Sequence, residues 1–172
     1  MSTKPFLEVK NLNVAFPTED GLVQASNDIS FTVARGETLA VVGESGSGKS
    51  VTSLAVMGLH DRKRTQITGQ AFLNLDSGPV DVISADEEIV RKLRGKAMSM
   101  IFQDPMSALH PYYSIGNQLI EAWELYNEGS KEDGKKRAIE MLDLVGIPGA
   151  NKRVDEFPHQ FSGGMRQRVM IA

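Results

Sequence analysis

The sequence predicts an α/β fold, and three observations along the chain lead to this class. The first 35 residues read as short strands separated by turn-forming residues. Next, a short apolar run precedes a glycine-rich loop and a helical segment, which is the order of a strand–loop–helix unit. From Ser114 onward, apolar residues recur at steps of three and four, which is typical of helices. The 172 residues therefore divide into a β-rich start, an α/β centre and a helical end.

The composition is that of a globular protein and argues against several classes of function. Hydrophobic residues make up 41% of the chain and charged residues 24%. The net charge of -3 disfavours a surface that neutralises nucleic-acid phosphates. Without cysteine, neither a disulfide framework nor a thiolate metal site is available. No apolar stretch approaches the roughly 18 residues of a membrane span, and the amino terminus lacks the apolar core of a signal peptide.

The opening segment is predicted to form antiparallel strands. Strands are expected at Phe6–Phe16 and Val23–Val33, because both runs are rich in strand-forming residues. Turn residues at Pro17–Gly21 separate the two strands, and a further break is expected near Asn27-Asp28.

The centre is predicted to alternate strands and helices. A strand is expected at Thr38–Val42 and a helix at Val51–Leu59. Another strand is expected at Ile67–Leu75, then a short acidic helix after Ser84, then a buried strand at Ala97–Phe102.

The last third is predicted to be helical. One helix should bury a face formed by Ile115, Leu119, Ala122, Trp123 and Tyr126. The next helix should bury Ala138, Leu142 and Val145, and a polar loop at Asn127–Lys136 should separate the two.

A phosphate-binding loop is the most specific motif in the chain. The pattern G-x-x-x-x-G-K-[ST] follows the apolar run and opens a helix, and its residues are Gly43, Glu44, Ser45, Gly46, Ser47, Gly48, Lys49 and Ser50. Glycines let backbone N–H groups curl around phosphate oxygens, and the helix start adds its positive dipole end. Lys49 would reach the β- and γ-phosphates, and Ser50 would ligate Mg²⁺. The alternative is a flexible turn that contains the same residues. Such a turn would not need a strand before it and a helix after it.

Two further elements are weak when each is taken alone. Gln103 follows the predicted strand Ala97–Phe102, where a glutamine is commonly just a solvated residue. Ser162 precedes Gly163-Gly164 and by itself predicts a helix cap, a very common arrangement.

In this order and spacing, the three elements resemble the ABC ATPases. The stretches VGESGSGKS, MIFQDPMSALHP and FPHQFSGGMRQRVMIA are similar to the oligopeptide, dipeptide and nickel importers of that family. The resemblance covers the whole chain, and it departs from the commoner pattern at His110 and Met165. It implies a P-loop NTPase fold of the ABC type. Residues 1–35 would form an antiparallel β subdomain, 36–103 an incomplete RecA-like core and 104–172 a helical subdomain with the signature.

The resemblance also implies which residues hold the nucleotide. Phe16 matches the aromatic residue that stacks on adenine, although an ordinary core strand residue fits it equally well. Gln103 matches the Q-loop glutamine, which senses the γ-phosphate and Mg²⁺. The family signature, which faces the nucleotide of a second subunit, is matched by Ser162, Gly163, Gly164, Met165 and Gln167.

One segment, Val80–Glu88, superficially resembles the strand that carries the catalytic Asp-Glu pair of the family. Ser84 and Glu87 instead fit a capping box, which predicts that a helix starts here. In the family, moreover, the catalytic strand follows the signature, whereas this segment precedes Gln103. No catalytic residue is therefore assigned in this chain.

A subunit of this kind would bind ATP and Mg²⁺ and hydrolyse ATP to energise the import of peptides or similar solutes. The implied partners are a second ATP-binding subunit, integral-membrane permease subunits and, indirectly, a solute-binding protein. The implied location is peripheral, on the cytoplasmic face of the cell membrane. Nucleic acid is not an expected partner, since the charge is unfavourable.

The chain ends at Ala172, inside the helix that the signature opens. We therefore expect a fragment that lacks the catalytic carboxylates and the switch histidine and that does not hydrolyse ATP alone. Two other functions stay open: a nucleotide-binding module without turnover, and a soluble ABC-family protein acting on nucleic acid. Comparing ATP binding with phosphate release would distinguish a binding module from an active ATPase. Copurification with a permease, or instead with RNA or DNA, would distinguish a transport subunit from a protein that acts on nucleic acid.

Overall fold

The computed structural model describes residues 4–102 and 108–172. These residues form two compact units, Met1–Ser99 and Met100–Ala172, each with its own hydrophobic clusters. None of the helices in the described ranges combines the length and the hydropathy that crossing a bilayer requires.

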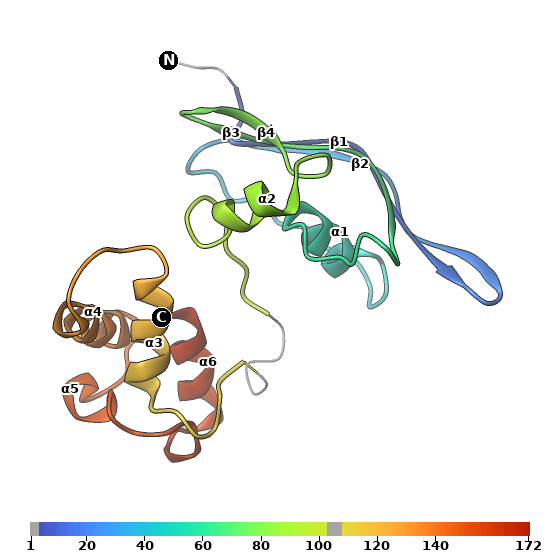
Figure 1. Cartoon of the computed structure of the whole chain (residues 1–172). Coiled ribbons are helices and arrows are strands. Elements are labelled where there is room, and N and C mark those ends of the chain that lie inside the picture. Colours follow the sequence, from blue (N-terminus) through green and yellow to red (C-terminus); the bar gives the residue numbers. More distant parts are fainter. Residues whose placement is uncertain (1–3, 103–107) are drawn as a thin grey trace. The chain divides into compact units, whose positions relative to one another are not determined.

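The first unit is an antiparallel sheet with two helices on one face (Figure 1). Its strands are β1 (Leu7–Thr18), β2 (Gly21–Val33), β3 (Gln66–Leu75) and β4 (Gly78–Asp81). Their order in the sheet is β2-β1-β3-β4, and every neighbouring pair is antiparallel. The helices are α1 (Lys49–Val56) and α2 (Glu87–Leu93). The predicted antiparallel opening is confirmed.

The predicted break near Asn27-Asp28 is wrong. Strand β2 continues through these residues, and only its pairing register with β1 shifts there. Asn11 and Asp28 face each other with positive φ values of 46° and 50°. Asn11 Nδ2 donates to Asp28 Oδ1 (2.6 Å), and Asp28 N donates to Asn13 Oδ1 (2.9 Å). These side-chain bonds replace the backbone hydrogen bonds that the register shift interrupts, so the strand continues.

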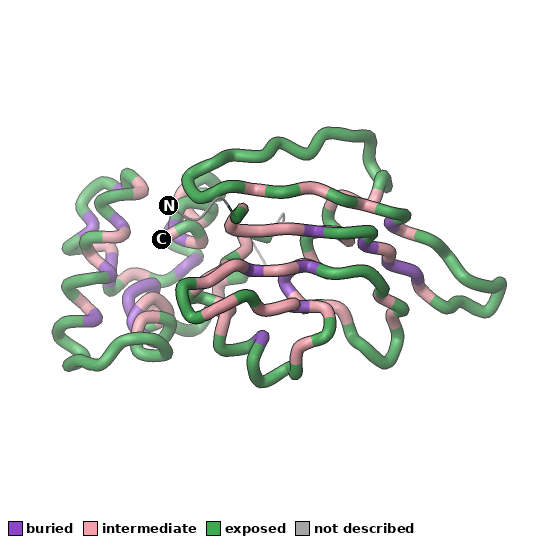
Figure 2. The backbone as a smooth tube through the Cα atoms, turned by 90° about the horizontal axis from the view of Figure 1, so that it is seen from above, coloured by how far each residue is buried: buried purple, intermediate pink, exposed green. Residues whose placement is uncertain are grey.

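The core of the first unit lies between the sheet and the helices. One cluster joins β1 and β3 to α1 and consists of Val9, Leu12, Val14, Ala55 and Ala71. A second cluster joins β3 to the α2 region and consists of Leu73, Val82 and Val90. Figure 2 shows these buried positions as short purple stretches along an otherwise half-buried or exposed trace.

Two segments predicted to be strands of the centre are not strands. Thr38–Val42 and Ala97–Phe102 join no ladder in the described residues, apart from an isolated bridge between Met98 and Arg94. Thr38–Val42 is exposed throughout, with Val42 at 89%, whereas Ala97–Phe102 is partly buried. In the second segment Ile101 is 59% exposed, but Met98 packs against the cluster of Leu73, Val82 and Val90. An extended segment becomes a strand only through hydrogen bonds to a neighbour, and the four strands of the sheet pair with one another.

The predicted helix after Ser84 is confirmed, but its predicted capping box is wrong. Asp86 is the N-cap of α2 and makes no side-chain cap bond. The Ser84 hydroxyl donates instead to Asp81 Oδ2 (2.8 Å). The second oxygen of Asp81 accepts from Ala71 N (3.0 Å), so this carboxylate fixes the turn after β4 and engages the serine that would have capped the helix.

The second unit is helical. Its elements are α3 (Ile115–Glu124), α4 (Lys131–Leu144), α5 (Ala150–Arg153), a 3₁₀ turn (Pro158–Gln160) and α6 (Gly163–Ile171). All four α-helices contribute to one core, formed by Ile115, Ile120, Ala138, Leu142, Ile147, Ala150, Val154, Phe161 and Val169.

The predicted faces of these helices are partly confirmed. Ala138 and Leu142 of α4 are buried as expected, whereas Ala122 and Tyr126 are exposed and Ile120 is buried instead. The buried stripe of α3 therefore follows Ile115 and Ile120.

The predicted polar loop at Asn127–Lys136 is too long, because α4 already begins at Lys131. A capping box starts the helix: Asp133 N donates to Ser130 Oγ (3.2 Å), and Ser130 N donates to Asp133 Oδ2 (3.0 Å). The Ser130 hydroxyl and N–H hold the pKa of Asp133 below its ordinary value. Two orphan backbone donors are thereby satisfied at the start of α4.

Candidate functional site

The glycine-rich loop lies between an exposed segment and the start of α1. Gly46 and Gly48 have φ values of 81° and 85°, a conformation that side chains rarely adopt. Within the loop, Ser47 N donates to Glu44 O (3.2 Å), which closes one turn of backbone. Gly48 is the N-cap of α1, and the helix begins at Lys49. The predicted order of loop and helix is confirmed.

The ammonium group of Lys49 is held by the loop itself. Its Nζ donates to Gly43 O (2.8 Å), Glu44 O (2.6 Å) and Ser47 Oγ (3.0 Å). These three bonds match the three donors of an ammonium group. They place a fixed positive charge at the loop, whose other residues are exposed or half-buried.

The start of α1 offers unpaired backbone donors. The first N–H groups of a helix have no acceptor within the helix, and Gly48 provides no side-chain cap. These N–H groups and the helix dipole favour an anion at this end. Ser50 is exposed in the first turn, so its hydroxyl is accessible. With the positive charge of Lys49 beside them, these N–H groups and the Ser50 hydroxyl suit a phosphate group.

Strand β2 supports the loop from behind. Gly48 lies so close to Ala25 O that a Cβ at position 48 would overlap this oxygen. Beside it, the hydroxyls of Ser26 and Thr52 are hydrogen-bonded at 2.8 Å. Ser26 is 6% exposed, and it is the one buried polar side chain among the residues that the structure describes. In the sequence, Ser26 stands out only as a polar residue at an inward-facing position of a strand. It lies outside the glycine-rich motif, so the motif does not point to it.

Phe16 lies in the same unit and contacts the chain that follows α1. Its ring meets that of His60 edge-on, with centroids 5.5 Å apart. His60 Nε2 is in turn hydrogen-bonded to Val51 O (2.8 Å), in the first turns of α1. Phe16 is half-buried and packs against the core cluster of β1 and α1. The ring is therefore partly a core residue and partly exposed.

The signature segment opens α6 in the second unit. The Ser162 hydroxyl accepts from Met165 N (3.3 Å), which confirms the predicted cap. Ser162, Gly163, Gly164 and Gln167 are exposed, whereas Met165 packs partly against the helical core. A Cβ at Gly163 or Gly164 would meet no atom within 4 Å. This helix start is thus open to an approaching group.

The structure brings together residues 43–50 with Ser26 and Thr52, and it holds Phe16 in the same unit. The signature belongs to the other unit. Gln103 lies outside the described residues.

Comparison with known proteins identifies relatives over the whole chain. The family model described as ABC transporter matches residues 26–172. A Brucella abortus (strain 2308) protein with the provisional name of a peptide import ATP-binding protein is 45% identical over 172 residues. The oligopeptide transport ATP-binding protein OppD of Bacillus subtilis (strain 168) is 48% identical over 171 residues. These alignments cover 100% and 96% of this chain but 51% and 46% of the relatives, so the chain spans about half their length.

Solved structures show the same fold. The ATP-binding cassette MJ0796, in a dimeric post-hydrolysis state bound to ADP and Pi, matches with a TM-score of 0.77 at 23% identity. This match covers 96% of the present chain and 67% of that one. Clostridium perfringens cbiO1, part of the ABC transporter complex cbiONQ, matches with a TM-score of 0.69 at 26% identity. This match covers 98% of the present chain and 60% of that one. With the family model matching from Ser26 to the last residue, the chain belongs to the ABC transporter family.

Proposed function

We propose that this chain is the nucleotide-binding part of an ATP-binding subunit that energises the import of peptides or similar solutes. The observation that carries the proposal is the geometry of residues 43–50. A backbone loop with two left-handed glycines leads into an uncapped helix start, and Lys49 is tied to the loop by three bonds. Similarity to proteins named for peptide import supports the solute class.

The loop would bind the β- and γ-phosphates of ATP through its N–H groups, and Lys49 would exchange one of its three loop bonds for a bond to a phosphate oxygen. Ser50 presents an exposed hydroxyl beside Lys49, an oxygen donor of the kind that Mg²⁺ accepts in phosphate sites. Bound there, Mg²⁺ would neutralise charge on the phosphate oxygens. Phe16, half-exposed in the same unit, would stack on adenine, and Gln103 would sense the γ-phosphate.

The signature would serve the nucleotide of a second subunit. Ser162, Gly163 and Gly164 lie at an open helix start, where N–H groups and the dipole favour a phosphate. Met165 and Gln167 would flank that contact. The dimeric state of a structural relative supports such a pairing. Closure of the pair would drive the permease subunits from the cytoplasmic face of the membrane, and hydrolysis would reset it. A solute-binding protein would deliver the solute.

Lys49→Ala tests the nucleotide assignment. The substitution removes a charge-assisted contact worth about 1.5 to 3 kcal/mol, so Mg-ATP should bind about 10- to 150-fold more weakly. Isothermal titration calorimetry with a non-hydrolysable ATP analogue measures the effect. In cells, the same substitution should lower the uptake of a labelled oligopeptide.

Lys92→Ala is the matched control for Lys49→Ala. Lys92 lies in the same unit, pairs with Glu88 at 3.3 Å and is 72% exposed. Its removal changes the net charge by the same amount without touching the loop, so the affinity should stay within twofold of the parent. Equal affinities for the Lys49 and Lys92 variants would contradict the proposed site.

A further inference from the structure

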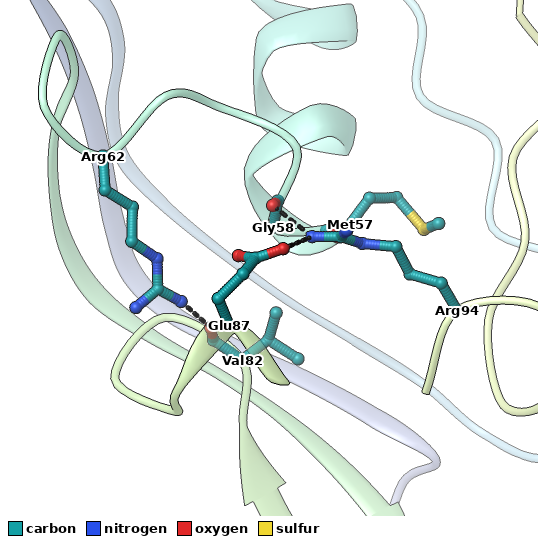
Figure 3. A network of polar contacts seen from close by, with 6 residues as sticks. All are labelled: Met57, Gly58, Arg62, Val82, Glu87 and Arg94. Carbon is teal, nitrogen blue, oxygen red and sulfur yellow. Dashed lines mark hydrogen bonds and ion pairs between the residues drawn. The ribbon is translucent and has the colours of Figure 1, made fainter. Parts of the chain in front are cut away.

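Arg94 connects the carboxyl end of α1 to α2 (Figure 3). Its Nε donates to Met57 O (3.0 Å), and one terminal nitrogen donates to Gly58 O (2.6 Å). The same terminal nitrogen is ion-paired with Glu87 Oε1 at 2.9 Å, in the first turn of α2. The guanidinium group therefore binds two carbonyls just beyond α1 and a carboxylate of another helix.

A guanidinium group suits this position on two grounds. The carbonyls of Met57 and Gly58 directly follow the last turn of α1, at the negative end of the helix dipole, which a cation stabilises. Arginine also presents its N–H groups in a planar fork, so it can bind two carbonyls at a fixed geometry. Lysine carries its three donors on one nitrogen at the end of a flexible stem, so it cannot reproduce the planar fork.

The connection is rigid because its surroundings are packed. The Arg94 side chain is only 22% exposed. Val90 of α2 is fully buried, and a Cβ at Gly58 would lie 2.8 Å from its side chain. Gly58 itself has a φ of 63°, which turns the chain sharply away from α1. The end of α1 is thus fixed against α2 by packing and by the bonds of Arg94.

The opposite end of α1 is the phosphate loop. Eight residues at 1.5 Å each make a helix of about 12 Å, so a tilt of about 5° at one end moves the other by about 1 Å. At the loop end, the Ser26–Thr52 hydroxyl pair, the bond of His60 to Val51 O and the contact of Gly48 with Ala25 hold the helix. Ala55 packs in the core nearer its carboxyl end. Displacements of this size degrade a binding site that depends on aligned donors.

We infer that Arg94 is a positioning residue for nucleotide binding, which orients the phosphate loop by fixing the far end of α1. The inference rests on the proposed function of residues 43–50. Arg94 itself would not touch the nucleotide. Its effect would pass through the rigid body of α1 to the N–H groups at Gly48 and Lys49.

Arg94→Met tests the inference. Methionine keeps much of the length and apolar contact of the side chain but removes its donors. Mg-ATP affinity should fall about fivefold at 15 °C, a temperature at which thermal unfolding must show the variant to be fully folded. Amide signals of Lys49 and Ser50 should also shift in ¹H–¹⁵N spectra without nucleotide, which a loss of stability alone would not cause.

Two controls separate positioning from stability and charge. Arg153→Met removes an arginine with comparable bonds, to Pro148 O (3.0 Å) and Glu156 (2.9 Å), in the helical unit. Arg62→Met removes the same charge in the first unit, where Arg62 donates to Val82 O (3.4 Å) and not to α1 (Figure 3). Both should bind Mg-ATP within twofold of the parent.

The outcomes distinguish this inference from the proposed function. If Lys49→Ala weakens binding but Arg94→Met stays within twofold of the parent, the positioning role is wrong and the site stands. If Lys49→Ala has no effect, the site itself is wrong. Should Arg94→Met not fold, Arg94→Lys decides: an intermediate loss of about twofold to threefold supports positioning, because one donor still reaches a carbonyl, and the parent affinity overturns it.

Discussion

Replacing Gly48 with alanine is expected to abolish measurable Mg-ATP binding. Position 48 has a φ of 85°, which costs about 1 to 2 kcal/mol for a residue with a Cβ. The added Cβ would also overlap Ala25 O, a backbone atom of β2 that cannot move aside as a side chain could. The loop must shift away from β2, and the N–H groups at the start of α1 lose their alignment. Calorimetric titration with Mg-ATP measures the loss.

Gly36→Ala is the matched control for this prediction. Gly36 has a φ of 75°, close to that of Gly48, but a Cβ there would meet no atom within 4 Å. Alanine at position 36 therefore has the cost of the left-handed conformation, as alanine at position 48 does, but it overlaps no atom. Both positions lie in the same unit. We expect Gly36→Ala to lower the unfolding midpoint slightly and to bind Mg-ATP as the parent does. If both variants bind alike, close packing of β2 against the loop does not shape the site.

The second large effect is expected from Gly164→Asp in the signature. A carboxylate at the start of α6 would face a γ-phosphate carried by another subunit, and two like charges at contact distance repel strongly. ATP-driven pairing of subunits should therefore be lost, while binding of Mg-ATP to the single chain should stay within twofold of the parent. Position 164 is open, with no atom within 4 Å of a Cβ, so the fold should tolerate the change. Analytical ultracentrifugation with and without the nucleotide measures pairing.

Gly164→Asn separates charge from bulk in this experiment. Asparagine has nearly the size of aspartate but no charge, so it should retain part of the ATP-dependent pairing. Equal loss in both variants would assign the effect to bulk alone. A loss of Mg-ATP binding by the single chain, comparable to that of Lys49→Ala, would instead contradict a signature that serves a partner's nucleotide.

Local signals in the sequence predicted what local interactions determine. The order of glycine-rich loop and helix at residues 43–56 is confirmed, because glycines and the helix start fix it within a few residues. The serine cap of α6 is confirmed for the same reason, since Ser162 bonds to a backbone N–H three residues away. The paired strands β1 and β2 also followed from their composition and the turn between them.

Predictions failed where distant residues decide the outcome. Thr38–Val42 has the composition of a strand, but strand formation depends on a neighbour that no local pattern reveals. Ser84 was expected to cap α2, yet the carboxylate of Asp81 takes its hydroxyl. The β2 break at Asp28 failed because Asn11 and Asn13 bond to Asp28 from another strand.

The support of the site was hidden from the sequence for the same reason. Ser26 and Arg94 are 23 and 45 residues from Lys49, and neither belongs to a recognisable motif. Only folding brings Ser26 to Thr52 and Arg94 to the end of α1. A phosphate-binding motif therefore names the groups that face a phosphate, whereas the residues that hold those groups in place must be found in the structure.

The central claim is that the N–H groups of residues 43–50 hold the phosphates of a nucleotide. Titrating ¹⁵N-labelled protein with Mg-ATP and following ¹H–¹⁵N spectra tests it residue by residue. We predict the largest shifts at the amides of Gly46, Gly48 and Lys49, with little change along Lys131–Leu144 of α4. Saturable shifts that spare the loop and fall in the helical unit would place the nucleotide elsewhere and contradict the account.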